Sequence, residues 1–443
     1  MKVQIVNGKA LLPTGLGNVN IEIEDGVISN ISRHLKSDSL AKVIDAKGQF
    51  IIPGFIDLHT NGIGGFDLTN GWYNQEKKSF SISKEKYLTG IENALKEYAK
   101  HGTTLVGFTT LEASVKKMKN ILNLIAEYKN NTESELKHIF HGIYMEGTFM
   151  KDKKYRGAHN PKYFFKPSIK LFNEFQKAAD GNIKIVNVVP EWGKDALKLI
   201  QYLASQNVLC AAGHTNANGN EYFAAIEKGL QLAIHVLNGP SSSSFKPFDN
   251  GGALEAILKT DKMHVEIITD SYHVDKSYLM DIIKRKGIDR CIAISDCMFI
   301  TNMKKIEEFK INGVSGKLSK NGEYIHIAGQ ENNNSLFGSV LTMDKAFENL
   351  LSWFTQPIEG IWNKLHEPLS FEEALLNASK MCSMNPAKIL GLNSNSSKQR
   401  TGSIEIGNSA DLVLTEIHRK TSNYELEIQW VLLKGNTVFA NRV

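Results

Sequence analysis

Residues 53–62 read PGFIDLHTNG. The five residues FIDLH form a short, mostly apolar run, which is typical of a buried β-strand, and the polar side chains of His59 and Asn61 stand at its end. A buried strand that ends in polar side chains recurs through the middle of the chain, so this stretch is the first unit of a repeated pattern.

Seven further runs of this kind follow FIDLH. They are TTLVGFTT, IFHGIYMEG, IKIVNVVPE, VLCAAGHT, LQLAIHVLN, HVEIITDSYH and CIAISDCM, which begin at residues 103, 139, 183, 208, 230, 264 and 291. Helical patterns such as SVKKMKNILNLIAEYK at 114–129 separate them. Strands that alternate with helices indicate βα units and a parallel sheet, and eight of them is the number in a closed (β/α)8 TIM-like barrel. We therefore predict an α/β fold with a barrel at 53–399.

The two ends of the chain have a different pattern. Short alternating runs joined by turn residues, such as NVNIEIEDGVISNIS at 18–32 and IQWVLLKGNTVFANRV at 428–443, predict β-hairpins. We expect residues 1–52 and 400–443 to fold together as one small β-sandwich domain.

Composition and charge exclude several classes of protein. The 443 residues are 42% hydrophobic and 22% charged, and 52 basic against 47 acidic residues give a net charge of +5. This excess is too diffuse for a nucleic-acid surface. No apolar run is long enough to span a membrane, the N-terminus has no signal-peptide pattern, and the four cysteines form no CxxC pair. These features predict a cytoplasmic protein without disulfides.

Polar residues that can bind a metal or transfer a proton recur at the C-terminal ends of six of the eight predicted strands. In a barrel all of these strand ends face one mouth, where active sites form. The residues are His59, Asn61, Glu146, His214, His235, His273 and Asp296.

This set has a definite chemistry. Two imidazoles and a carboxylate are a common catalytic zinc set that leaves one position for water. The metal acidifies that water and polarises a carbonyl group, while a nearby aspartate can move the proton to a leaving amine. The residues alone therefore predict hydrolysis of a carboxamide or a related bond.

Several motifs resemble the amidohydrolase superfamily and, within it, the deacetylases of N-acetylglucosamine-6-phosphate. PGFID at 53–57 and GSIEIGNSADLVL at 402–414 are similar to segments found throughout the superfamily. The elements typical of the deacetylase branch lie in YMEGTFM at 144–150, RGAHNP at 156–161, AAGHTNAN at 211–218, HVLNGP at 235–240 and FGSVLTM at 337–343. The segments DSYHVD at 270–275 and ISDCM at 294–298 are also similar to the family.

The resemblance implies a role for each matching residue. Glu146, His214 and His235 would bind one divalent ion, most simply Zn²⁺, and Asp296 would be the general base and then the general acid. His159 would polarise the acetyl carbonyl. The sugar phosphate would lie against Asn238, Gly239, His273 and, from the partner subunit of a homodimer, the residue that matches the family's phosphate-binding arginine, here Lys246.

The chain departs from the family pattern at three places. The HxH pair of the first strand is here His59-Thr60-Asn61, and because an amide is a poor ligand for transition metals we expect one ion and not two. Lys246 stands in place of an arginine, and a lysine binds phosphate as a point charge without the bidentate fork. Thr148 replaces a usual proline.

Other functions fit the same scaffold. The enzyme could deacetylate another amino-sugar phosphate, such as N-acetylgalactosamine-6-phosphate, or an N-acyl-amino acid, and the second of these would need no phosphate-binding residues. A binding module without catalysis is a third interpretation, but it would be expected to lose metal ligands or the general base, and all four of these residues are present.

Overall fold

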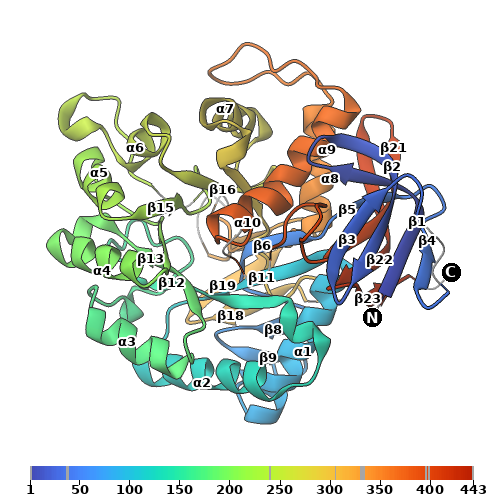
Figure 1. Ribbon diagram of the computed structural model, residues 1–443. Coiled ribbons are helices and arrows are strands. Elements are labelled where there is room, and N and C mark those ends of the chain that lie inside the picture. The colour runs from blue at the N-terminus through green and yellow to red at the C-terminus, as the bar shows by residue number, and fades with distance from the viewer. Residues whose placement is uncertain are drawn as a thin grey trace.

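The centre of the molecule is a parallel sheet of eight strands (Figure 1). The computed structural model describes residues 2–35, 39–238, 241–304, 306–329, 335–394, 397 and 400–441. Each strand of the sheet pairs in parallel with the next along the chain. In order they are β6 (Phe55–Thr60), β11 (Thr103–Thr110), β12 (Phe140–Phe149), β13 (Ile183–Val188), β14 (Leu209–Ala212), β15 (Leu230–Ala233), β16 (His264–Ile268) and β17 (Cys291–Ile294). The eight predicted strands are therefore confirmed, and so is the α/β class.

Helices connect these strands and surround the sheet (Figure 1). Parallel neighbours need such crossovers, because a hairpin would reverse the strand direction. Helix α1 packs Tyr87, Ile91 and Leu95, spaced four residues apart, against the sheet. The longer helices are α1 (Lys84–Lys100), α2 (Val115–Asn131), α3 (Ile169–Ala178), α4 (Lys194–Ser205), α5 (Gly219–Glu227), α6 (Ala253–Lys259), α7 (Lys276–Lys286), α8 (Met343–Phe354), α9 (Phe371–Ser379) and α10 (Asn385–Ile389). The short 3-10 helices are η1 (Glu135–His138), η2 (Pro161–Tyr163), η3 (Pro190–Trp192), η4 (Phe248–Asn250) and η5 (Ile288–Arg290), and η6 (Lys380–Met384) is a π-helical turn.

The first and last strands of the sheet, β6 and β17, are linked by individual hydrogen bonds. The main-chain N–H of Asp296 donates to the carbonyl oxygen of His59 at 2.8 Å. The hydroxyl of Ser295 donates to the buried carboxylate of Asp57 at 2.5 Å. No strand ladder joins β17 to β6 within the described residues. The parallel sheet is thus established, whereas its closure into a barrel stays a prediction.

Both chain ends contribute to a second, mixed sheet. Its strands are β1 (Lys2–Leu12), β2 (Gly15–Glu24), β3 (Val27–Ser32), β4 (Lys42–Asp45), β5 (Phe50–Pro53), β21 (Leu412–Lys420), β22 (Asn423–Leu433) and β23 (Asn436–Ala440). Strand β5 pairs antiparallel with β21 and so joins the N-terminal and C-terminal parts. Buried aliphatic side chains, among them Val3, Ile21 and Leu412, form the core of this sheet. Strands from both chain ends thus share one continuous sheet, whereas a separate β-sandwich domain at 1–52 and 400–443 stays a prediction.

Two small antiparallel sheets follow the ends of β6 and β17. The first contains β7 (Gly62–Ile63), β8 (Phe66–Asp67), β9 (Gly71–Asn74) and β10 (Ser79–Ser81), and the second contains β18 (Glu308–Ile311), β19 (Val314–Leu318) and β20 (Ile325–Ile327). They share an apolar cluster that includes Tyr73, Phe299, Phe309 and Phe337. These two sheets, which border the mouth of the central sheet, were not predicted from the sequence.

The helices of the described residues include none with the length and apolar character needed to cross a bilayer. The cysteines Cys210, Cys291, Cys297 and Cys382 are buried and free.

Candidate active site

A cavity of about 190 Å³ opens at the carboxyl ends of the parallel strands. Eight of the residues predicted for the site line it: Asn61, Glu146, His159, His214, His235, Asn238, His273 and Asp296. The fold therefore brings together side chains that lie up to 235 positions apart in the sequence, as in the hydrogen bond between Asn61 and Asp296. His59 is fully buried beside this group without lining the cavity.

Three of the lining residues have an unusual backbone. His214, His235 and Asp296 follow β14, β15 and β17 by two residues each, and their φ angles are +54°, +21° and +50°. Residues other than glycine seldom adopt this left-handed region, although aspartate and histidine do so more often than most, and such conformations are concentrated at functional sites. The tight turn aims each side chain back over the strand ends.

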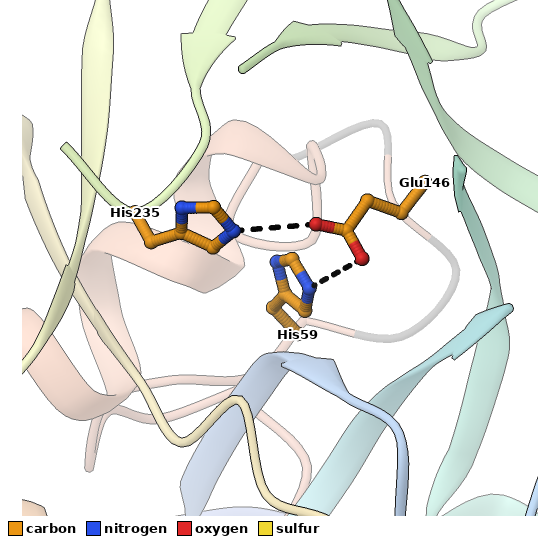
Figure 2. Close-up of side chains that lie close together, drawn as sticks. All are labelled: His59, Glu146 and His235. Carbon is orange, nitrogen blue, oxygen red and sulfur yellow. Dashed lines mark hydrogen bonds and ion pairs between the residues drawn. The ribbon is translucent and has the colours of Figure 1, made fainter. Parts of the chain in front are cut away.

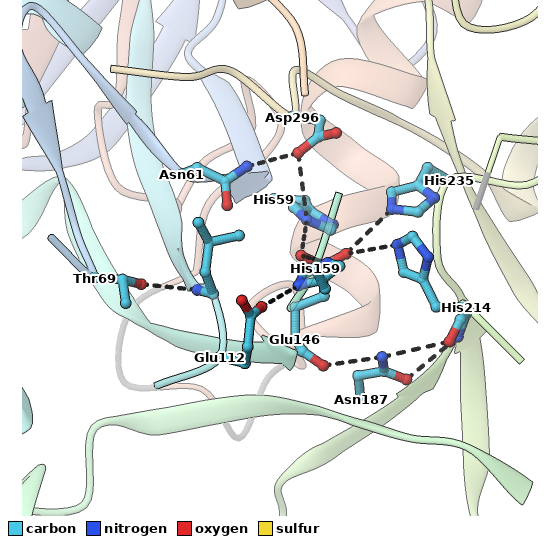
Figure 3. Close-up of polar contacts among 12 residues, drawn as sticks. His59, Asn61, Thr69, Glu112, Glu146, His159, Asn187, His214, His235 and Asp296 are labelled. Atoms are coloured by element: carbon cyan, nitrogen blue, oxygen red, sulfur yellow. Dashed lines mark hydrogen bonds and ion pairs between the residues drawn. The ribbon is translucent and has the colours of Figure 1, made fainter. Parts of the chain in front are cut away.

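Glu146 is the centre of the side-chain cluster (Figures 2 and 3). Its Oε1 lies 3.2 Å from His235 Nε2 and 3.4 Å from His214 Nε2. Its Oε2 lies 3.5 Å from both His59 Nε2 and His159 Nε2. All five side chains are buried.

This arrangement fits a metal ion. Tetrahedral ligands with bonds of about 2.0–2.1 Å stand roughly 3.3 Å apart, close to the contacts of Glu146 with its histidines. Two overlapping sets have mutually close ligand atoms: His59, Glu146 and His235, and Glu146, His159 and His214. The predicted ligands Glu146, His214 and His235 are drawn from both sets.

The ring of His214 is prepared to act as a ligand through Nε2. Its Nδ1 lies 2.9 Å from the carbonyl oxygen of Tyr155, which fixes Nδ1 as the donor and leaves the lone pair on Nε2. Gly157 lies against the ring, and a Cβ at this residue would stand 2.6 Å from His214 Cε1. Burial lowers the pKa of His214 to about 4, with added repulsion from His159 and His235, so the ring is neutral at pH 7.

His159 has the opposite electrostatic state. Burial alone would lower its pKa, but the carboxylates of Glu146 and Glu112 outweigh burial and raise the pKa of His159 to about 10. Burial alone would raise the pKa of Glu146, but the neighbouring imidazoles of His59 and His159 hold this pKa well below its usual range. The cluster thus contains a neutral imidazole, a cationic imidazole and a carboxylate within a few ångströms.

The other predicted residues lie around this cluster. Asp296 Oδ1 accepts a hydrogen bond from Asn61 Nδ2 at 2.7 Å and lies 3.7 Å from His59 Nε2. His273 Nδ1 lies 2.6 Å from Asp270 Oδ2. Burial opposes protonation of His273, but Asp270 overcomes this and raises the pKa of the imidazole. His273 and Asn238 both line the cavity.

Of the predicted substrate-binding residues that the structure describes, Lys246 does not line the cavity of this chain. Lys246 is exposed, and its main-chain N–H donates to Ser244 Oγ at 3.2 Å. Gly239 lies outside the described residues.

Two buried carboxylates of the site were missed from the sequence. Glu112, which is 1% exposed, contacts His159, and Glu266, which is fully buried, contacts His59 Nδ1 at 3.1 Å and the main-chain N–H of His235 at 3.2 Å. A signal was present for each. Glu112 follows the predicted strand TTLVGFTT by two residues and so lies near a strand end like the other site residues, and Glu266 is the one acidic residue within the apolar run HVEII.

The fold and the site define an α/β protein that gathers metal-ligating side chains at the carboxyl ends of a parallel sheet. The chain matches the amidohydrolase family over residues 50–438 and belongs to that family.

Relatives with curated functions match nearly the whole chain. The N-acetylglucosamine-6-phosphate deacetylase of Bacillus subtilis (strain 168) is 26% identical over 433 residues, covering 96% of this chain and 94% of its own. That of Vibrio furnissii is 25% identical over 420 residues, covering 94% and 89%. The N-acetylgalactosamine-6-phosphate deacetylase of Escherichia coli O157:H7 is 23% identical over 402 residues, with 90% of each chain covered.

Solved structures show the same fold. The N-acetylglucosamine-6-phosphate deacetylase from Pasteurella multocida superposes with a TM-score of 0.79 at 22% identity, with complete coverage of both chains. A mutant of the deacetylase from Mycobacterium smegmatis, in complex with N-acetyl-D-glucosamine-6-phosphate, superposes with a TM-score of 0.77 at 21% identity, covering 99% of each chain.

Proposed function

We propose that this chain hydrolyses the acetamide of N-acetylglucosamine-6-phosphate to glucosamine-6-phosphate and acetate. One observation carries the proposal: the buried cluster of Glu146, His214 and His235 shares a cavity with Asp296 and His159, the two groups that such a hydrolysis needs. The curated deacetylases that match most of the chain support the choice of substrate.

Glu146, His214 and His235 would hold one divalent ion, with zinc the simplest choice for a site of nitrogen and oxygen ligands. When bound, that ion supplies a water molecule of lowered pKa and polarises the acetyl carbonyl group. His59 Nε2, which has no hydrogen-bond partner within the described residues, is buried next to the same carboxylate.

The side chains of the cavity would carry out the proton transfers. Asp296 accepts a proton from the attacking water through its carboxylate, while the water oxygen bonds to the acetyl carbon. His159 donates from Nε2 to the acetyl oxygen as negative charge develops there. Asp296 then gives the proton to the amide nitrogen, the C–N bond breaks, and the amine of the sugar leaves with acetate as the second product.

The sugar phosphate would lie against Asn238, Gly239 and His273. The raised pKa of the His273 imidazole suits a dianionic phosphate. Lys246 would complete this site from the partner subunit of a homodimer. Phe245 and Phe248, on either side of Lys246, are 102% and 76% exposed, which is costly for aromatic side chains in a monomer. Their burial against a second copy would place Lys246 close to that copy.

The finer features of the architecture belong to the same proposal. We infer that β6 and β17 close the parallel sheet into a barrel at residues 53–399. The terminal sheet, at 1–52 and 400–443, would fold over its own core as a β-sandwich. The buried free cysteines fit a reducing cytoplasmic location.

An acetate-release assay tests the proposed function. Purified, zinc-loaded chain is offered N-acetylglucosamine-6-phosphate, its galactosamine epimer, unphosphorylated N-acetylglucosamine and an N-acetyl-amino acid, with the Asp296→Asn variant as the control for contaminating activity. We expect the highest kcat/KM for the glucosamine phosphate.

The epimer is the second candidate, because a curated relative of 23% identity acts on N-acetylgalactosamine-6-phosphate. A higher kcat/KM for that substrate would replace the first proposal by this one. Release from the amino acid alone would contradict both proposals.

A further inference from the structure

Glu112 is a buried carboxylate that the proposed mechanism does not use. It follows the end of β11 by two residues, and only 1% of its surface is exposed. A carboxylate in such surroundings needs hydrogen-bond donors, because an unpaired buried charge is strongly destabilising. The identity of these donors shows what the residue does.

The two oxygens of Glu112 contact different partners. Oε2 lies 2.6 Å from Nδ1 of His159, whereas Oε1 accepts from the main-chain N–H of Asn160 at 2.9 Å and from Asn312 Nδ2 at 3.0 Å. Figure 3 shows Glu112 beside the His159 ring at the edge of the metal-ligating cluster. The carboxylate therefore binds the imidazole and the following peptide of the same loop at once.

The opposite edge of the His159 ring faces the site. Its Nε2 lies 3.5 Å from Glu146 Oε2, and His159 lines the cavity. The contact with Glu112 requires Gly147, because a Cβ at this residue would stand 2.8 Å from Glu112 Oε2 and 2.9 Å from His159 Nδ1. The ring thus has a carboxylate at each edge, with the shorter contact to Glu112.

Glu112 also holds the β18–β19 hairpin against this loop. Asn312, in the turn of the hairpin, donates from Nδ2 to the carbonyl oxygen of Glu112 at 2.8 Å as well as to Oε1. Asn160 Nδ2 donates to the carbonyl oxygen of Asn312 at 2.7 Å. Three segments that are distant in the sequence therefore meet at one carboxylate.

We propose that Glu112 is a positioning residue for His159: it makes Nδ1 the bonded edge of the ring and presents Nε2 to the acetyl oxygen of the substrate. This role rests on the proposed deacetylation, because it acts through His159 in that reaction. An acceptor-only side chain is required, since the three groups around Glu112 approach it as donors. Glutamine has the same shape but would turn an NH₂ group toward one of these donors.

A double-mutant cycle tests the role. Glu112→Gln, His159→Ala and the double variant are compared with the wild type on N-acetylglucosamine-6-phosphate, with metal content and melting temperature measured for each. We expect Glu112→Gln to lower kcat about ten- to a hundredfold, as a misplaced catalytic group does, and to leave KM within about threefold. The double variant should be no slower than His159→Ala.

The matched control is Asn312→Gly, which removes the hairpin contact and keeps a backbone that tolerates the observed φ of +48°. We expect it to retain most of the wild-type kcat. A loss in Asn312→Gly equal to that in Glu112→Gln would make Glu112 a structural tie for the hairpin and overturn the positioning role. Losses in the double variant that multiply would overturn it as well.

A measurement without substrate separates this proposal from the proposed function. In ¹⁵N-histidine-labelled, metal-loaded protein, the proton between His159 and Glu112 should give a downfield imidazole signal that is absent from both His159→Ala and Glu112→Gln. A wild-type chain that shows this signal but releases no acetate would overturn the proposed function, and the catalytic role of the pair with it. An active chain in which Glu112→Gln keeps the signal and the full kcat would overturn the positioning role alone.

Discussion

The carboxamide of Asn61 donates a hydrogen bond of 2.7 Å from Nδ2 to Oδ1 of Asp296. Both side chains are buried, and Asn61 Oδ1 has no partner within the described residues. The bond joins the end of β6 to the residue that follows β17, and it orients the carboxylate to which we assign the proton transfers. The amide of Asn61 therefore binds Asp296, whereas a histidine at residue 61 could bind a second metal ion.

Metal content should follow the identity of residue 61. We predict about one tightly held divalent ion per wild-type chain, and about two in Asn61→His, because an imidazole beside His59, Glu146 and Asp296 would complete a second ligand set. Elemental analysis after gel filtration measures both numbers.

Asn61→Gln is the matched control, since it keeps the amide and adds no strong ligand. It should remain at one ion per chain. Two ions in the wild type that resist mild chelation would contradict the one-metal interpretation.

Asp296→Asn should retain the metal and lose most of the rate. Removal of a general acid–base group commonly lowers kcat by about 10² to 10⁴-fold. Steady-state kinetics with a parallel zinc determination checks this expectation. His214→Ala provides the contrast. It should lose metal and activity together, because it removes one of the three proposed ligands, the imidazole whose Nδ1 is bound by the carbonyl oxygen of Tyr155.

A near-normal kcat in Asp296→Asn would show that another group accepts the proton. Cys297 is a poor substitute, because burial raises the pKa of its thiol above the physiological range.

Much of the fold follows from local sequence pattern. Each of the eight central strands is a short apolar run bounded by helical segments, so its length and the alternation with helices identify it. The sheets made by β7–β10 and β18–β20 were missed, because their strands have two to five residues and little alternation. Their stability comes from tertiary contacts such as that of Phe309 with Phe299, at 5.0 Å between ring centroids.

The site was predictable where a polar side chain lies in the last part of an apolar run or just after it, as at Glu146, His214 and Asp296. It was not predictable where a residue acts by contact across the sheet. Glu266 is 207 positions from His59, and nothing local to either residue indicates that they meet at 3.1 Å. The two edges of the His159 ring likewise meet two carboxylates that are distant in the sequence, Glu146 in β12 and Glu112 just after β11.

His141 predicts a loss of stability in acid. It lies in β12, and burial together with Lys129 and Lys184 lowers its pKa to about 3. The unfolded chain binds a proton at this residue below about pH 6.5, whereas the folded chain does not until about pH 3. The free energy of unfolding should therefore fall as the pH drops from about 6.5 to about 3. His141→Gln should make this decline less steep.

Urea titrations from pH 7 to pH 4 measure this slope. His34→Gln, which removes an exposed imidazole, is the control and should reproduce the wild-type slope. The same slope in His141→Gln as in the wild type would show that other groups cause the acid sensitivity.

Lys246→Ala should raise KM for the phosphorylated sugar roughly tenfold to a hundredfold, because a hydrogen bond to a charged group is worth about 1.5–3 kcal/mol. It should leave the weak activity on unphosphorylated N-acetylglucosamine nearly unchanged, since that sugar offers the lysine no phosphate. Steady-state kinetics on both substrates decides this, with Lys198→Ala, on the exposed face of α4, as the control. Light scattering tests the dimer that would bring Lys246 to the partner's cavity. An equal effect on both substrates, or a fully active monomer, would contradict phosphate binding across a subunit interface.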